Sequence, residues 1–129
     1  ANLVLPQRRV IAVCGDGGFL MNVQEMETAR RLDSNIVAMV WEDKAYGLIA
    51  WKQQTHFGQH TDLSFGNPDW LKLASAFGWK GHVVDKSTDL VPTLEKAFKE
   101  RGPSLVVIPI DYRENMKLTE RLGDIACAI

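Results

Sequence analysis

Four short β-rich segments, separated by stretches of helical character, constrain the fold of this chain more than any other feature. They cover residues 10–14, 36–41, 80–84 and 105–110. Apolar residues run continuously through most of them, which is typical of strands buried on both faces. Strands that alternate with helices indicate βαβ units, which give a parallel sheet with right-handed crossovers. We therefore predict an α/β fold: an open, mainly parallel sheet with helices on both faces, truncated at its N-terminal end.

Four helices are expected in the remaining segments, over residues 21–33, 47–54, 67–77 and 88–101. In the first, Glu25 lies early and Arg30 lies late, the charge order that a helix dipole favours. The third opens on Asn67-Pro68-Asp69, where a capping residue precedes a proline at the first helical position. Ser87 is expected to cap the fourth helix. Residues 55–66 are expected to form a polar loop.

Composition limits the domain count and the kinds of partner. A chain of 129 residues has room for one domain, and its 46% hydrophobic residues suffice for a core. A net charge of −1 gives no reason to expect nucleic acid or an anionic membrane as a partner. Cys14 and Cys127 match no metal or redox spacing, which fits a reducing cytosol and predicts a cytoplasmic protein.

Two acidic residues follow the first two predicted strands directly. Asp16 lies in the glycine-rich turn at residues 15–18, and Asp43 follows the second strand. Ligands of open α/β sheets bind at the carboxyl ends of the strands, where neighbouring strands would bring the two carboxylates together. Two hard oxygen ligands favour Mg²⁺, and a glycine-rich backbone can approach an anion closely. The residues therefore suggest a site for Mg²⁺ and a diphosphate.

Other readings of the glycine-rich turn differ in how well they fit. A dinucleotide-binding fingerprint would need a third glycine where Leu20 stands. A phosphate loop of the Walker type would need a Gly-Lys-Ser or Gly-Lys-Thr, and none follows. The turn could also be a simple connection between a strand and a helix, with Asp43 as a solvated loop acid. The motif taken alone leaves this last alternative open.

The pair of motifs narrows the choice. Gly15-Asp16-Gly17, followed after a few tens of residues by Glu42-Asp43, resembles the cofactor-binding motif of thiamine diphosphate (ThDP, thiamine pyrophosphate) enzymes. In that superfamily the motif is Gly-Asp-Gly and then Asn-Asn. The resemblance implies that Mg²⁺ is bound by Asp16, by Asp43 and by the carbonyl of Ala45. It further implies a cofactor-binding set made of Gly15, Gly17, Gly18, Phe19, Tyr46 and Gly47.

One departure from the family pattern affects the charge of the site. Glu42-Asp43 stands where the superfamily has Asn-Asn, so Asp43 keeps an oxygen ligand but adds a negative charge near the diphosphate. Diphosphate binding should then depend more on the backbone N–H groups of residues 17–20. Catabolic acetolactate synthases carry this aspartate, and residues 15–29, 65–78 and 102–112 resemble the same family. The resemblance therefore implies the C-terminal ThDP-binding domain of an acetolactate synthase of the catabolic type.

The resemblance also concerns the substrates. Leu48 and Ile49 would lie beside the thiazolium ring. Biosynthetic members carry a tryptophan that shapes the second substrate's pocket, and Lys52 stands at the matching position here. Trp51, one residue earlier, would point about 100° away on a helix. This difference favours pyruvate as donor and acceptor, with Lys52 either contacting the acceptor's carboxylate or simply solvated.

The resemblance implies an incomplete enzyme. Residues 1–129 would form a single ThDP- and Mg²⁺-anchoring domain of a larger acetolactate synthase, which condenses two pyruvates to 2-acetolactate with loss of CO₂. The missing N-terminal and middle domains and a homo-oligomer, dimer or tetramer, would complete the active site, so the chain alone should not turn over. Two alternatives stay open: another ThDP-dependent 2-oxoacid decarboxylase or aldehyde carboligase, and a non-catalytic α/β module that binds a phosphate ligand.

Overall fold

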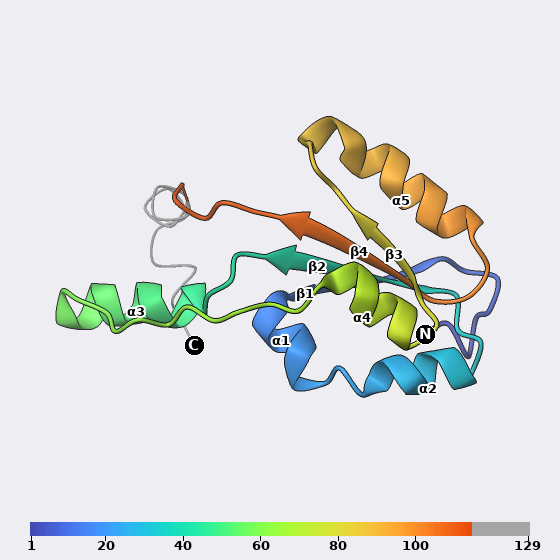
Figure 1. Cartoon of the computed structure of the whole chain (residues 1–129), viewed down its shortest axis with the longest axis horizontal. Helices are drawn as coiled ribbons and strands as arrows, with labels where there is room; N and C mark the ends of the chain where they lie inside the picture. The colour runs from blue at the N-terminus through green and yellow to red at the C-terminus, as the bar shows by residue number, and fades with distance from the viewer. Residues whose placement is uncertain (115–129) are drawn as a thin grey trace.

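The described part of the chain forms a four-stranded parallel sheet. A computed structural model describes residues 1–114; Cys127 lies outside them. The strands are β1 (Val10–Gly15), β2 (Ile36–Glu42), β3 (Lys80–Val83) and β4 (Ser104–Pro109). They lie in the order β1-β2-β4-β3, and every pair is parallel (Figure 1). The predicted open parallel α/β sheet is therefore confirmed.

Helices cover both faces of the sheet, as predicted. On one face lie α1 (Asp16–Met21), α2 (Glu25–Arg31) and α4 (Trp70–Ala76), and on the other lies α5 (Leu90–Lys99) (Figure 1). The first face buries a core of apolar residues: Met26, Ala38, Val40, Trp70, Ala74, Trp79, Leu105 and Val107. The second face buries a smaller one: Val37, Val84, Ala97 and Val106. The side chains alternate between the two clusters along β2 and β4, as a strand requires.

The first predicted helix was wrong in extent. Where one helix was expected over residues 21–33, the structure has α1 and α2, separated by a turn at residues 22–24. α1 begins directly after β1, so the glycine-rich segment is the first turn of a helix. Gly17, Gly18 and Asn22 all have a low helix propensity. For this reason α1 was not predicted from the sequence.

Two other helix starts also differ from the expectation. α4 begins at Trp70 and its cap is Asp69, whose carboxylate accepts a hydrogen bond from the backbone N–H of Lys72 at 3.1 Å. Asn67, the expected cap, is instead bonded to acidic side chains of the site. Ser87 opens a short 3₁₀ turn, η1 (Ser87–Asp89), and α5 starts only at Leu90.

The connection after β2 is a helix that stands away from the sheet. α3 (Gly47–Phe57) runs three residues beyond its predicted end, so the expected loop begins at Gly58, whose φ of 70° ends the helix. All of α3 is described, and every one of its residues is at least partly exposed. Figure 1 shows α3 projecting beyond the carboxyl ends of the strands. Within residues 1–114, no helix has both the length and the apolar character needed to cross a membrane.

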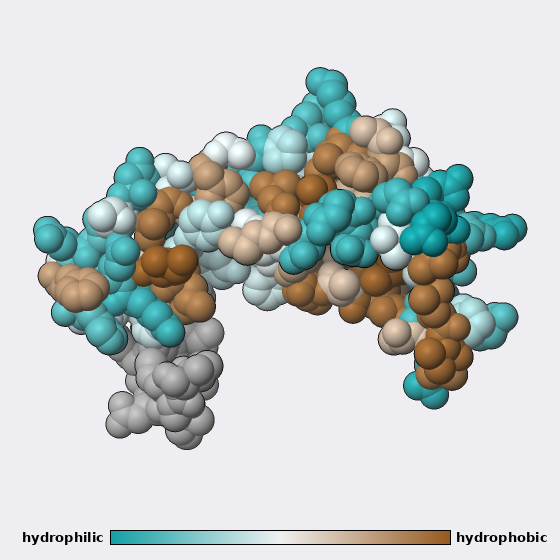
Figure 2. Space-filling view, turned by 90° about the horizontal axis from the view of Figure 1, so that it is seen from below, coloured by the Kyte–Doolittle hydropathy of each residue, from teal (hydrophilic) through white to brown (hydrophobic). Residues whose placement is uncertain are grey.

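Apolar surface is left uncovered around β1. α5 packs over β3 and β4, whereas Ile11 and Val13 on β1 are 41% and 56% exposed. Leu3, Val4 and Leu5 in the segment before β1 are exposed as well. Figure 2 shows brown apolar areas that interrupt the teal hydrophilic surface on the face it presents. This part of the fold therefore lacks the cover that the β4 region has.

Candidate cofactor and metal site

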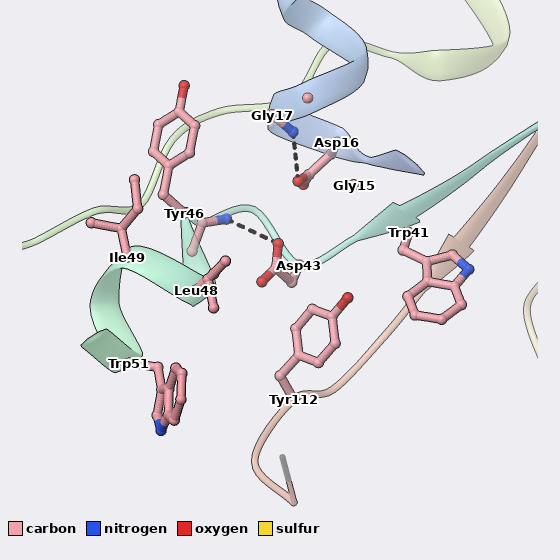
Figure 3. A pocket seen from close by; sticks show the side chains of 13 residues that line it. Gly15, Asp16, Gly17, Trp41, Asp43, Tyr46, Leu48, Ile49, Trp51 and Tyr112 are labelled. Carbon is pink, nitrogen blue, oxygen red and sulfur yellow. Dashed lines mark hydrogen bonds between the residues drawn. The ribbon is translucent and has the colours of Figure 1, made fainter. Parts of the chain in front are cut away.

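A cavity of about 460 Å³ lies at the carboxyl ends of β1 and β2 (Figure 3). The register pairs Gly15 with Trp41, so both strands end at the same edge of the sheet. The start of α1, the turn after β2 and the first turns of α3 form the walls. The lining residues are Gly15, Asp16, Gly17, Gly18, Trp41, Asp43, Ala45, Tyr46, Gly47, Leu48, Ile49, Trp51 and Tyr112.

Asp16 is the most strongly held side chain of the site. It is only 2% exposed, and its Oδ1 accepts a hydrogen bond from the backbone N–H of Gly17 at 2.8 Å. Its Oδ2 accepts one from the backbone N–H of Lys44 at 2.8 Å and one from Asn67 Nδ2 at 2.7 Å. Burial raises the pKa of Asp16, but the hydrogen bonds from Asn67, Lys44 and Gly17 outweigh it and hold the pKa below its ordinary value. Asp16 is therefore an ionised carboxylate.

Asp43 shares the same edge of the cavity. Its Oδ1 accepts a hydrogen bond from the backbone N–H of Ala45 at 3.4 Å (Figure 3). Burial and the negative charge of Asp16 raise the pKa of Asp43 above its ordinary value. Tyr112 is affected in the same way, because burial and the charges of Asp43 and Asp16 raise the pKa of its hydroxyl. A cation between the two carboxylates would relieve this concentration of negative charge.

The turn after β2 is fixed by a second segment of the chain. Lys44 has a φ of 61°, a left-handed conformation that is uncommon outside glycine. Phe65 donates its backbone N–H to the carbonyl of Lys44 at 2.9 Å, and Tyr46 donates to that of Leu63 at 3.1 Å. Ala45 and Ser64 form an antiparallel bridge. These bonds hold the strained turn in place, and it is this turn that directs the N–H of Lys44 at Asp16.

Two glycines of the cavity are required by close approach. A Cβ added to Gly47 would lie 2.8 Å from Asp43 Oδ2, and one added to Gly17 would lie 2.9 Å from Cε1 of Tyr46. A Cβ at Gly15 or Gly18, by contrast, would meet no heavy atom of the described residues within 4 Å. Gly47 thus makes room for the carboxylate, while Gly15 and Gly18 leave backbone open toward the cavity.

The donor set suits magnesium better than a transition metal. Within residues 1–114, no group of three or more His, Cys, Asp and Glu side chains could hold a metal ion. Two carboxylates at one edge of an open cavity match Mg²⁺, which binds through one or two carboxylates and keeps other positions for phosphate oxygens and water. The residues present therefore fit Mg²⁺ together with a diphosphate.

Comparison with known proteins identifies the family. Residues 1–108 match the family described as "Thiamine pyrophosphate enzyme, C-terminal TPP binding domain". The chain belongs to this family. This confirms the predicted resemblance and assigns the cavity to a domain that binds thiamine pyrophosphate.

Similar TPP-binding domains occur in much longer proteins. The chain is 42% identical to the catabolic acetolactate synthase of Raoultella terrigena, over 93% of this chain and 22% of that protein. It is 38% identical to the acetolactate synthase of Bacillus subtilis (strain 168), over 92% of this chain and 21% of that protein. The chain therefore spans about a fifth of the length of these relatives.

A solved structure supports the fold independently. The benzoylformate decarboxylase of Polynucleobacter necessarius superposes with a TM-score of 0.74 at 23% sequence identity. The match covers 84% of this chain and 21% of that one. Comparison of coordinates thus supports the fold of the chain independently of its sequence.

Most of the predicted site residues meet at the cavity. All three predicted metal ligands line it, as do the predicted neighbours of the thiazolium ring, Leu48 and Ile49. Five of the six predicted cofactor-binding residues line it too: Gly15, Gly17, Gly18, Tyr46 and Gly47. The assumption that β1 and β2 are neighbours, on which this grouping depended, is confirmed.

Phe19 and Lys52 lie elsewhere. The ring of Phe19 packs into the core against Trp70, with 5.9 Å between ring centroids. Lys52 is exposed and is not among the described residues that line the cavity. Trp51 lines the cavity instead, on the α3 side, although it was expected to point away. The direction in which α3 leaves the sheet decides which of its faces meets the cavity.

Three residues that line or support the cavity were not predicted from the sequence. Tyr112 follows β4, and it reaches the cavity because β4 lies beside β2. Trp41, at the end of β2, was assigned only to a strand. Asn67 had been read as a helix cap, so its bond to Asp16 was not foreseen. The local pattern gave no signal of this bond, because an extended asparagine before a proline is also a favourable start for a helix.

Proposed function

We propose that this chain is the ThDP- and Mg²⁺-anchoring domain of an acetolactate synthase, which condenses two pyruvates to 2-acetolactate with loss of CO₂. The observation that carries the proposal is the pairing of Asp16 and Asp43 at one edge of the cavity, in a TPP-binding domain. The names of the relatives from Raoultella terrigena and Bacillus subtilis support acetolactate as the product.

Asp16, Asp43 and the carbonyl of Ala45 would hold Mg²⁺. Asp16 is ionised and fixed by three hydrogen bonds, so it binds the cation without first losing a proton. Asp43 has a raised pKa, and a bound cation would lower it and favour the ionised ligand. The open backbone at Gly15 and Gly18 gives the diphosphate room beside the cation. When bound, ThDP supplies the electron sink for decarboxylation of a 2-oxoacid.

The apolar side of the cavity would exclude water from the reacting centre. Leu48, Ile49 and Trp51 present their side chains there from α3, and Tyr112 closes the side next to β4 (Figure 3). Leu48 and Ile49 are 65% and 48% exposed in this chain, so they need further cover to form a dry site. We attribute that cover to the remaining domains and to a second subunit of a homo-oligomer. The chain alone should then show no turnover.

The substrate assignment changes in one respect. Trp51 lines the cavity and Lys52 does not, so the wall of the cavity that α3 forms contains an indole ring. A contact between Lys52 and the acceptor's carboxylate therefore gains no support from the geometry. Preference for pyruvate as acceptor depends on the similarity to the catabolic enzyme. A cytoplasmic location is also proposed, on the low number and wide spacing of the cysteines.

Product analysis tests the proposal. The full-length protein is incubated with pyruvate, ThDP and Mg²⁺, and the products are followed by NMR. Acetolactate as the main product would support the assignment. Acetaldehyde would instead indicate a simple 2-oxoacid decarboxylase with the same cofactor site. Failure to bind ThDP in the presence of Mg²⁺ would favour a binding module for another phosphate ligand.

A further inference from the structure

Asp16 is connected to the core by a chain of side chains that lies outside the cavity lining. Asn67 Nδ2 donates to Asp16 Oδ2 at 2.7 Å and to Glu42 Oε1 at 3.0 Å. The indole Nε1 of Trp70 donates to the same Glu42 oxygen at 2.8 Å. One amide nitrogen thus joins the carboxylates at the ends of β1 and β2. Glu42 is one of the residues that depart from the Asn-Asn pattern.

The orientation of the Asn67 amide follows from its neighbours. An asparagine has two N–H donors and one carbonyl acceptor. Both donors face carboxylates, and the reverse orientation would place the amide oxygen against two negatively charged groups. Asn67 Oδ1 is buried and has no hydrogen-bond partner within the described residues. The side chain therefore donates to both carboxylates, while its oxygen accepts no hydrogen bond from the described residues.

The same contacts leave one oxygen of Asp16 with spare capacity. Oδ2 accepts two hydrogen bonds, which fill the roughly two lone-pair sites of a carboxylate oxygen. Oδ1 accepts one, from the backbone N–H of Gly17. At the far end of the network, Trp70 is 6% exposed and packs on Phe19 in the core. The rotation of the Asp16 carboxylate is thereby linked to a rigid part of the fold.

We propose that Asn67, held by Glu42 and Trp70, is a positioning residue that occupies Oδ2 of Asp16 and leaves Oδ1 to bind the cation. This inference rests on the proposed function, because it requires a divalent cation at Asp16. Residues that orient a metal ligand typically change metal affinity about 10- to 100-fold when they are removed.

The test uses the full-length enzyme and Mn²⁺ as a spectroscopic probe for the Mg²⁺ site. Mn²⁺ binding in the presence of ThDP is titrated by electron paramagnetic resonance. Asn67→Ala should weaken Mn²⁺ binding about 10- to 100-fold. The Mg²⁺ concentration for half-maximal activity should rise by a similar factor, while saturating Mg²⁺ restores kcat. Trp70→Phe keeps an aromatic ring in the core but removes the donor to Glu42, so it should weaken binding in the same direction by less.

Asn2→Ala is the matched control. Asn2 is also a buried asparagine, and its Oδ1 accepts hydrogen bonds from Ser34 Oγ at 3.1 Å and from the backbone N–H of Asn35 at 2.9 Å, beside the start of β2. Its removal should lower the melting temperature and leave Mn²⁺ affinity unchanged. If Asn67→Ala behaved in the same way, the inference would be overturned and Asn67 would be purely structural.

The outcomes separate this inference from the proposed function. A wild-type enzyme that binds no Mn²⁺ with ThDP would contradict the proposed function itself. A wild-type enzyme that binds Mn²⁺, with unchanged affinity in Asn67→Ala, would contradict only the role of Asn67. A loss of kcat in Asn67→Ala that excess Mg²⁺ does not restore would also count against it. If Asn67→Ala fails to fold, unchanged Mn²⁺ affinity in Trp70→Phe overturns the network.

Discussion

The two halves of the sheet differ in how completely they are covered. On β4, Leu105, Val106 and Val107 are at most 1% exposed, between α4 on one face and α5 on the other. On β1, Ile11 and Val13 are 41% and 56% exposed, and α3, which projects beyond the carboxyl ends of the strands, buries none of its residues, all of which are described. The cavity lies on the less covered half. We infer that the β4 half gives the domain its stability, whereas the β1 half becomes complete only inside a larger protein.

The largest expected effect concerns the metal ligand on the open half. Asp16→Ala in the full-length protein should abolish Mg²⁺-dependent ThDP binding, a loss beyond the roughly 10- to 100-fold that removal of a supporting residue causes. Isothermal titration with ThDP, with and without Mg²⁺, measures it. Because the loss of this buried carboxylate leaves the donors of Gly17, Lys44 and Asn67 without their acceptor, the melting temperature of the apoprotein should fall as well. Unchanged ThDP affinity would remove Asp16 from the metal site.

Shortening a buried side chain in the covered half should lower the stability of the protein and leave cofactor binding unchanged. Leu105→Ala creates a cavity in a fully buried position and should lower the free energy of unfolding by about 2–5 kcal/mol. Thermal denaturation of the full-length protein gives the shift. Val13→Lys provides the comparison on β1. A lysine at this position should leave stability unchanged if the strand is exposed to solvent, and should lower stability if a neighbouring domain covers the strand. If Val13→Lys left the stability of the full-length protein unchanged, this would contradict our inference that another part of that protein covers β1.

A smaller effect is expected from the glycine beside Asp43. Gly47→Ala places a methyl group 2.8 Å from Asp43 Oδ2, so the carboxylate must move and Mg²⁺ affinity should fall about 10-fold. Gly66→Ala is the matched control, since its Cβ would meet no heavy atom of the described residues within 4 Å. Mn²⁺ titration distinguishes them. Equal affinities in the two variants would show that Asp43 is not held against Gly47 in the working enzyme.

The smallest effect concerns Cys14, which is half-buried on β1. Burial raises the pKa of its thiol, so the neutral form persists to higher pH than in an exposed cysteine. Alkylation of Cys14 should therefore be slow at neutral pH and accelerate only above the ordinary thiol pKa. Mass spectrometry of the modified peptide follows the reaction. Fast alkylation at neutral pH would contradict the half-buried position of the Cys14 thiol.

Much of the fold could be predicted from the sequence, because continuous apolar segments mark buried strands with little ambiguity. All eight strand ends were correct to within one residue. Helix starts were less predictable where tertiary contacts overrode local signals. Asn67 looks like a cap in the sequence, but its amide is bonded to Asp16 and Glu42, so α4 starts later with Asp69.

The parts of the site that come from consecutive strands could be predicted from the sequence. The parts that depend on the order of the strands in the sheet could not. Asp16 and Asp43 meet because β1 and β2, which follow each other in sequence, are neighbours in the sheet. Tyr112 reaches the cavity because β4 is inserted between β2 and β3, an order that the apolar pattern does not encode. The choice between Trp51 and Lys52 depended on the direction of α3, which its own sequence does not determine.

A crystal structure of the full-length enzyme with ThDP and Mn²⁺ tests the central claim most directly. We expect an anomalous peak for Mn²⁺ between the carboxylates of Asp16 and Asp43, in contact with the diphosphate, and close to Asp16 Oδ1. An anomalous peak at any other site, or a diphosphate bound away from Gly15 and Gly18, would contradict the assignment of this cavity.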